Sequence, residues 1–102
     1  MANTMPLTSE QTRSLKKLAH HLKPVVMIGQ HGLSEGVIGE IDTSLDVHEL
    51  IKVKLAGADK SDREALSAAI VERLSADLVQ IIGRVAIFYR ANPKKKKNRI
   101  VI

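Results

Sequence analysis

Residues 29–32 have the sequence Gly-Gln-His-Gly, and glycines at this spacing could hold a phosphate group. Glycine at both ends lets the backbone turn sharply and lets another backbone approach without meeting a Cβ. The apolar run of residues 25–28 predicts a strand buried on both faces just before the loop, and Ser34 is a suitable N-cap for a helix after it. The first amides and the positive dipole end of that helix would face the loop as an anion site. A phosphodiester is the natural ligand; the alternative is that the glycines serve only a tight connection.

Catalytic and metal-binding patterns are missing from the sequence. The loop lacks the lysine and hydroxyl residue of a nucleotide-hydrolysing loop and the third glycine of a dinucleotide fingerprint. The four histidines, His20, His21, His31 and His48, form no His-Glu-x-x-His pattern, and no Gly-x-Ser-x-Gly segment occurs. The lack of cysteine excludes disulfides, thiolate metal sites and a cysteine nucleophile. We therefore expect a protein that is not an enzyme and that uses no cofactor or metal.

Positive charge is unevenly distributed along the 102 residues. Lysine and arginine number 16 against 11 aspartate and glutamate, for a formal net charge of +5. Five of the positive charges lie in residues 94–99, so the charges of the remaining chain sum to zero. Phe88 and Tyr89 are the only Phe, Tyr or Trp residues, too few for the stacking platforms of common single-strand binders. A nucleic acid, if bound, must be held mainly through its backbone and by charge.

The first segment available to position these groups is a basic helix. Residues 9–21 repeat apolar side chains at helical spacing, and Thr8 with Gln11 forms a capping-box pattern at its start. Pro24 ends the helix because the residue before a proline is pushed out of the helical region. On the opposite face, spacings of three and four residues place basic side chains in one stripe. The stripe consists of Arg13, Lys16, Lys17 and His20.

A second helix and a strand come after the glycine loop. The helix capped by Ser34 should extend to about Val47 and carry acidic side chains outward. Residues 49–56 alternate between apolar and polar side chains, which is the pattern of a half-exposed strand. Lys52 and Lys54 therefore project from the same face or edge of the sheet.

A third helix and two strands complete the pattern. Residues 62–75 have helical spacing and begin with a capping box at Ser61. Residues 78–82 and 85–89 are β-rich, and the short Gly83-Arg84 turn between them has glycine where positive φ is often needed.

The order of these elements, α-β-α-β-α-β-β, predicts an α/β (α+β) fold in a single domain with two layers. Two successive strand-helix-strand units imply right-handed crossovers and a mixed sheet of about four strands packed against helices. The length fits one domain, which we place at residues 1–93. A basic segment, residues 94–102, comes after it.

Several segments resemble the bacterial YhbY family, whose members consist of a single CRM domain, the chloroplast RNA splicing and ribosome maturation module. The resemblance spans roughly residues 14–90, and its motifs are long and ordered. It is carried by residues 22–37 (LKPVVMIGQHGLSEGV), 40–42 (EID), 48–54 (HELIKVK), 79–83 (VQIIG) and 87–90 (IFYR).

The resemblance implies a fold similar to the C-terminal domain of translation initiation factor 3. It also implies RNA binding through the Gly-x-x-Gly loop and nearby basic residues, and association with precursors of the large ribosomal subunit. Many relatives have a lysine after the first glycine, where this chain has Gln30, so the loop tip has one charge fewer.

The residues expected to contact RNA share a place in the glycine loop or on a basic surface. Most of them would contact phosphates and sugars, so we expect recognition of shape more than of base sequence. They are Gly29, Gln30, His31, Gly32, Arg13, Lys16, Lys17, His20, Lys23, Lys52, Lys54, Arg84, Arg90, Lys94, Lys95, Lys96, Lys97 and Arg99.

Two points about the basic segment stay open at this stage. Its lysines could form a flexible arm that finds RNA by long-range attraction, or a tail that only aids solubility. Residues 99–102 could form a last strand or a frayed end.

The N-terminus has no signal-peptide pattern, and no apolar run is long enough to span a membrane. We therefore expect a cytoplasmic protein, a monomer, whose partner is RNA rather than a membrane or a small-molecule substrate. Two alternatives remain: a non-enzymatic protein-interaction module, and a general RNA chaperone acting on other RNAs.

Overall fold

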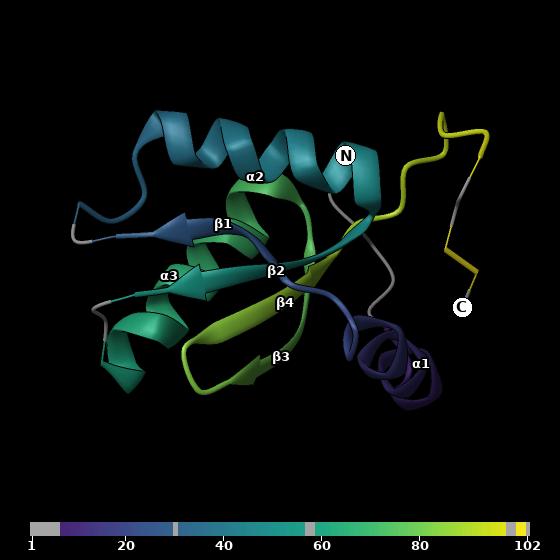
Figure 1. The fold of residues 1–102 in the computed structure, drawn as a ribbon, viewed down its shortest axis with the longest axis horizontal. Helices are drawn as coiled ribbons and strands as arrows, with labels where there is room; N and C mark the ends of the chain where they lie inside the picture. The colour runs from purple at the N-terminus through teal and green to yellow at the C-terminus, as the bar shows by residue number, and fades with distance from the viewer. Residues whose placement is uncertain (1–6, 30, 57–58, 98–99, 102) are drawn as a thin grey trace.

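Helices and strands occur along the chain in the order predicted from the sequence. The computed structural model describes residues 7–29, 31–56, 59–97 and 100–101 (Figure 1). Within them the order α-β-α-β-α-β-β confirms the predicted fold class. The elements are α1 (Ser9–Ala19), β1 (Pro24–Ile28), α2 (Glu35–His48), β2 (Leu50–Leu55), α3 (Lys60–Leu74), β3 (Asp77–Ile82) and β4 (Val85–Tyr89).

The strands form one mixed sheet with the order β1-β2-β4-β3. β1 is parallel to β2, and β4 runs antiparallel to both β2 and β3. α2 connects the parallel neighbours β1 and β2, because parallel strands need a crossover rather than a hairpin. α3 connects β2 to β3 and leaves room for β4 between them. The turn into β4 contains Gly83 at φ +58°, which confirms the predicted need for glycine there.

The larger core lies between the sheet and the pair α2 and α3. Ile51, Val53 and Leu55 alternate along β2 toward this side, as a period of two predicts, and all three are buried. Phe88 of β4 and Ile70 of α3 belong to the same core. Packing of α2 against this core also fixes the position of the glycine loop that precedes it.

A smaller core lies on the opposite face of the sheet, where α1 packs. Leu15 and Ala19 of α1 form this core with Leu50 of β2 and with Ile87 and Tyr89 of β4. The predicted two-layer arrangement is therefore wrong at this end of the sheet, which has helices on both faces. The cause is that the alternate positions of β2 and β4 are also apolar here and gain free energy by leaving water.

β1 differs from the predicted fully buried strand. Val26 and Ile28 are buried, whereas Val25 and Met27 are 46% and 60% exposed. β1 is an edge strand, and α1 does not extend across it, so one of its faces meets solvent. An unbroken apolar run did not distinguish this situation from burial on both faces.

The helix starts show which local predictions are correct. The capping box of Thr8 and Gln11 is present at α1, and Ser34 caps α2. α3 starts differently from the prediction: its N-cap is Asp59, not Ser61, and its first helical residue is Lys60. The carboxylate of Asp59 accepts a backbone amide of the first turn at 2.8 Å, so this cap satisfies the same need by another side chain.

Candidate nucleic-acid interface

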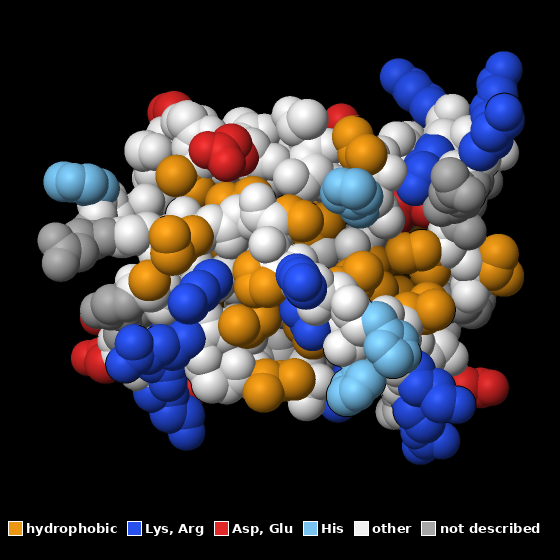
Figure 2. Space-filling view, in the orientation of Figure 1, with side chains coloured by type: hydrophobic (Ala, Val, Ile, Leu, Met, Phe, Trp, Pro, Cys, Tyr) orange, Lys and Arg blue, Asp and Glu red, His pale blue; other side chains and the backbone are white. Residues whose placement is uncertain are grey.

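The part of the sheet that α1 leaves uncovered forms an open surface. Across it, strand pairing places Met27 of β1 beside Lys54 of β2, Val85 of β4 and Ile82 of β3. Met27 and Ile82 are 60% and 55% exposed. Figure 2 shows basic and hydrophobic side chains intermixed on this face, with acidic side chains toward its rim. Such a surface suits a polyanion that also presents apolar groups, as nucleic acid does through its sugars and bases.

A basic groove lies between α1 and the neighbouring part of this sheet face. Its volume is about 480 Å³, and its walls come from α1, the turn after it, and strands β2, β3 and β4. The basic stripe of α1 and Lys52 of β2, which the sequence predicts separately, lie together in this groove. Lining side chains include no carboxylate, so the local charge is positive. The charged or titratable side chains that line the basic groove are those of Arg13, Lys16, Lys17, His20, His21 and Lys52.

The turn after α1 adds His21, a residue that the sequence patterns did not assign to the site. α1 ends at Ala19, two residues before the predicted end, so helical spacing does not describe the position of His21. The rings of His20 and His21 pack edge to face with centroids 5.2 Å apart. Lys52 Nζ donates a hydrogen bond to the carbonyl oxygen of Leu22 at 3.0 Å. This contact joins the turn after α1 to β2.

The glycine loop lies at the end of the sheet where β1 and β2 finish (Figure 1). The Gly32 N–H donates to the carbonyl of Gly29 at 3.1 Å, and Gly32 has a φ of +68°, which favours glycine. Gly29 has no such φ, and a Cβ built on it would meet nothing within 4 Å. The fold therefore requires glycine at position 32 but not at position 29. His31 is exposed, and Gln30 lies outside the described residues.

The start of α2 is a weaker anion-binding site than the sequence predicts. Ser34 Oγ already accepts the Val37 N–H at 3.2 Å. Glu35 in the first turn also places its own carboxylate near the positive end of the helix dipole, and Arg73 of α3 pairs with it at 2.9 Å. The local charges at this helix end are thus largely balanced. The open space beside Gly29, where a Cβ would meet no atom within 4 Å, is unaffected by this balance of charges.

Two further candidates, Lys54 and Arg84, lie at the same end of the sheet as the glycine loop. The Leu55 N–H donates to the carbonyl of Arg84 at 2.6 Å, which places the β3–β4 turn beside the end of β2. The Ala56 N–H donates to the carbonyl of Ile28 at 3.0 Å, which joins the end of β2 to the start of the loop. The open surface therefore runs from the basic groove to this end of the sheet.

Arg90 is placed elsewhere and has another role. Its guanidinium pairs with Asp42 at 2.8 Å and Asp46 at 3.0 Å on α2, and it donates to the carbonyl of Leu74 at the end of α3 at 2.9 Å. The side chain is only 19% exposed. Arg90 therefore joins α2, α3 and the end of β4. Its charge is compensated, so we leave it out of the interface.

Residues 94–97 of the basic C-terminal segment lie at the end of the sheet opposite the glycine loop (Figure 1). Lys94, Lys96 and Lys97 are exposed, and Lys95 is half-buried. Arg99 lies outside the described residues. The described residue Ile100 is not in a strand, and its N–H donates to a side-chain oxygen of Glu49 at 2.8 Å.

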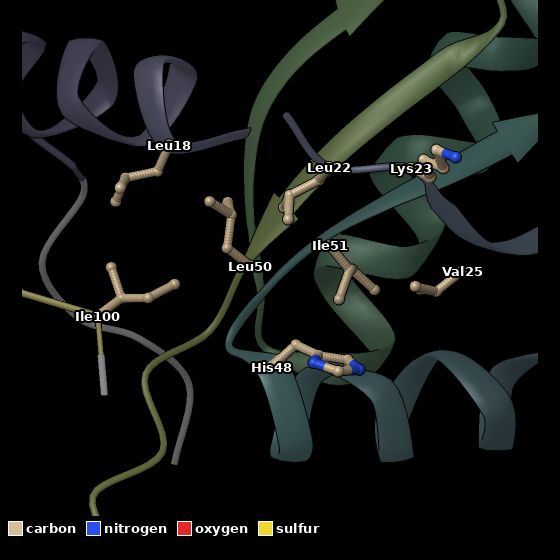
Figure 3. A pocket seen from close by; sticks show the side chains of 8 residues that line it. All are labelled: Leu18, Leu22, Lys23, Val25, His48, Leu50, Ile51 and Ile100. Atoms are coloured by element: carbon tan, nitrogen blue, oxygen red, sulfur yellow. The ribbon is translucent and has the colours of Figure 1, made fainter. Parts of the chain in front are cut away.

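Lys23 borders an apolar pocket rather than the basic groove. The pocket has a volume of about 450 Å³ and lies between the end of α1, β1, the end of α2 and the start of β2 (Figure 3). Leu18, Leu22 and Ile100 form part of its wall, and His48 stands at the end of α2 beside it.

Two other kinds of site are absent from the part of the chain that the structure describes. There, no three histidine, aspartate or glutamate side chains gather as a group that could hold a metal ion. None of its helices is long and apolar enough to cross a membrane.

Comparison with known proteins places the chain in a family. Residues 7–90 match the family model of the CRS1 / YhbY (CRM) domain. The chain belongs to this family. The match includes α1, the glycine loop and all four strands, so the basic groove and the open surface are parts of the CRM domain itself.

Several relatives of this CRM domain are named for RNA binding. A probable RNA-binding protein of Pseudomonas aeruginosa is 50% identical over 94 residues, which cover 92% of this chain and 90% of the relative. One from Bacillus subtilis is 33% identical and covers 89% of this chain and 95% of the relative. The solution structure of a Staphylococcus aureus protein proposed to bind RNA has a TM-score of 0.79 at 35% identity. That match covers 94% of this chain and 99% of the other.

Replacement of each loop glycine by alanine tests their different roles. Gly32→Ala should lower the free energy of unfolding by about 1–2 kcal/mol, because an L side chain is disfavoured at φ +68°. Gly29→Ala is the matched control and should change it by less than about 0.5 kcal/mol. Urea denaturation of the three proteins measures both values, and equal losses would contradict the assignment.

Proposed function

We propose that this protein binds RNA on the open surface and in the basic groove. The convergence of positive side chains from α1 and β2, with two histidines of the turn after α1 beside them, carries this proposal. Lysine and arginine gain affinity for nucleic acid by neutralising phosphates and releasing counterions. The relatives' names support the same partner. The chemistry is binding alone, and we propose no catalytic step.

Each part of the interface has a distinct task in this proposal. The basic groove and Lys54 neutralise phosphates along the strand. The fold itself would tolerate a side chain at position 29. The role of Gly29 in this proposal is to let the RNA backbone come close at the loop. Exposed Met27 and Ile82 can contact sugars and bases between the charges. This arrangement favours recognition of RNA shape over base sequence, because few side chains are placed to read base edges.

We further propose that the RNA is ribosomal RNA in precursors of the large subunit, and that the protein assists assembly of that subunit as a cytoplasmic monomer. Support comes from the resemblance of the motif-bearing segments to a ribosome-maturation module. A factor with salt-sensitive, shape-directed binding can associate with a precursor and leave once the RNA has folded.

Neutralisation of one groove lysine tests the interface. Lys16→Gln should weaken RNA binding and flatten the dependence of log K on log salt by about 0.7 to 0.9, the contribution of one phosphate contact. Lys60→Gln is the matched control, because Lys60 is exposed at the start of α3, which covers the other face of the sheet. Filter binding to one RNA hairpin at several salt concentrations gives both slopes. Equal flattening by the two variants would remove the groove from the interface.

The ribosomal target is tested by sedimentation of cell extract at low salt. The protein should appear with precursors of the large subunit and leave them as salt is raised, because phosphate contacts are screened. Crosslinks from the exposed His31 should fall within large-subunit RNA. Crosslinks spread over many other RNAs would support the chaperone alternative, and protein found only at the top of every gradient would contradict an assembly role.

A further inference from the structure

One buried carboxylate holds both ends of the lysine-rich segment. Glu49 lies between α2 and β2 and has no solvent exposure. Its Oε2 accepts the N–H of Asn92 at 2.7 Å, and its Oε1 accepts the N–H of Ile100 at 2.8 Å. Residues 92 and 100 are therefore held at the same side chain, and four lysines lie between these positions in the sequence. We call the described residues 92–97 and 100 the lysine loop.

Further contacts strengthen each end of the lysine loop. At the first end, the side-chain amide of Asn92 donates to the carbonyl of Asp46 at 3.0 Å, and its oxygen accepts the Lys94 N–H at 3.1 Å. The Arg90 N–H just before it donates to the carbonyl of Glu49 at 2.8 Å. At the second end, Ile100 packs against the core beneath α1 and forms part of the apolar pocket wall. Both ends are thus held by the folded domain.

The backbone of Glu49 suggests that its side chain has a specific task. Its φ of +64° is a conformation that favours glycine and that residues with a Cβ rarely adopt. Glycine would remove this strain but could not bind the two amides. The carboxylate is the feature that the lysine loop requires.

We infer that Glu49 is a positioning residue that closes the lysine loop and presents Lys94, Lys96 and Lys97 as fixed charges for the RNA backbone. This inference rests on the proposed RNA binding. Figure 2 shows the basic side chains of this segment at the same end of the molecule as those of α1, with hydrophobic side chains between the two groups. Lysines on a backbone that is held at two points lose less conformational freedom on binding than lysines on a free arm. The lysine loop thereby adds a second group of positive charges at the end of the sheet opposite the glycine loop.

Glu49→Gln tests this inference because the clamp and simple electrostatics predict opposite signs. Glutamine offers one carbonyl oxygen, and its NH₂ group would face the other amide, so one of the two contacts is lost. Amide hydrogen exchange at Asn92 or Ile100 should become about tenfold faster. Affinity for one RNA hairpin should fall about threefold to fivefold. Loss of a negative charge alone would instead strengthen the binding of a polyanion.

Two comparisons show whether Glu49 acts through the lysines. In a background with Lys94→Gln, Lys96→Gln and Lys97→Gln, Glu49→Gln should have no further effect on RNA affinity, because the charges that it positions are gone. Glu40→Gln, the same chemical change at an exposed site on α2, should leave exchange at Asn92 and Ile100 unchanged. It should leave affinity equal or slightly higher.

The effect of Glu49→Gln in the two backgrounds supports or overturns the role of Glu49. Unchanged or tighter RNA binding by Glu49→Gln in the lysine-bearing protein would overturn it, and so would equal losses in both backgrounds, which would indicate a general loss of stability. If Glu49→Gln does not fold, Glu49→Gly removes both the carboxylate and the strain and should show the same pattern. Failure of the unmodified protein to bind any RNA would instead refute the proposed function, a result distinct from all of these.

Discussion

The three described helices are too few to cover both faces of the sheet. The rest of the structure depends on which face each helix packs against. α2 and α3 pack together on one face and bury the central strands there. α1 is left for the other face and reaches only the rows that contain Leu50, Ile87 and Tyr89. The remaining rows are in contact with solvent. Because α1 alone packs on this face, part of the sheet stays open to solvent, and the basic helix α1 bounds this open surface on one side.

The distribution of charge has the same asymmetry. On the α2 and α3 side, Arg73 pairs with Glu35, and Arg90 pairs with Asp42 and Asp46. These contacts compensate acidic side chains with basic ones near the covered face. The basic groove has no carboxylate in its lining, so its charges remain available to an external polyanion. A net charge of zero outside residues 94–99 thus conceals two surfaces of different character.

Local signals in the sequence predicted most of the elements, because their causes lie within a few residues. The capping box at Thr8, the Ser34 cap, the alternation along β2 and the glycine turn before β4 are all of this kind. Features that depend on distant partners were not predictable in this way. The exposure of β1 depends on where α1 packs, and the role of Arg90 depends on carboxylates more than forty residues away in the chain.

The candidate site could likewise be predicted only where its features depend on neighbouring residues in the sequence. Its basic residues could be found from composition and spacing, but their meeting in one groove required the position of α1 across β2. No sequence pattern marked Gln80 as part of the site, because its only feature was its place in a strand, yet it lines the basic groove. No pattern marked Glu49 either, since a glutamate between a helix and a strand is usually a solvated residue. Its burial and its two amide contacts arise from a segment that returns to it from the end of the chain.

An NMR titration of the protein with one RNA hairpin tests the central claim most directly. If RNA binds the open surface and the basic groove, the amide resonances that shift should belong to α1, the turn after it, the glycine loop, and the exposed positions of β2 and β3. The outer faces of α2 and α3 should stay unchanged. Shifts confined to those outer faces, with α1 and the glycine loop unaffected, would contradict the account.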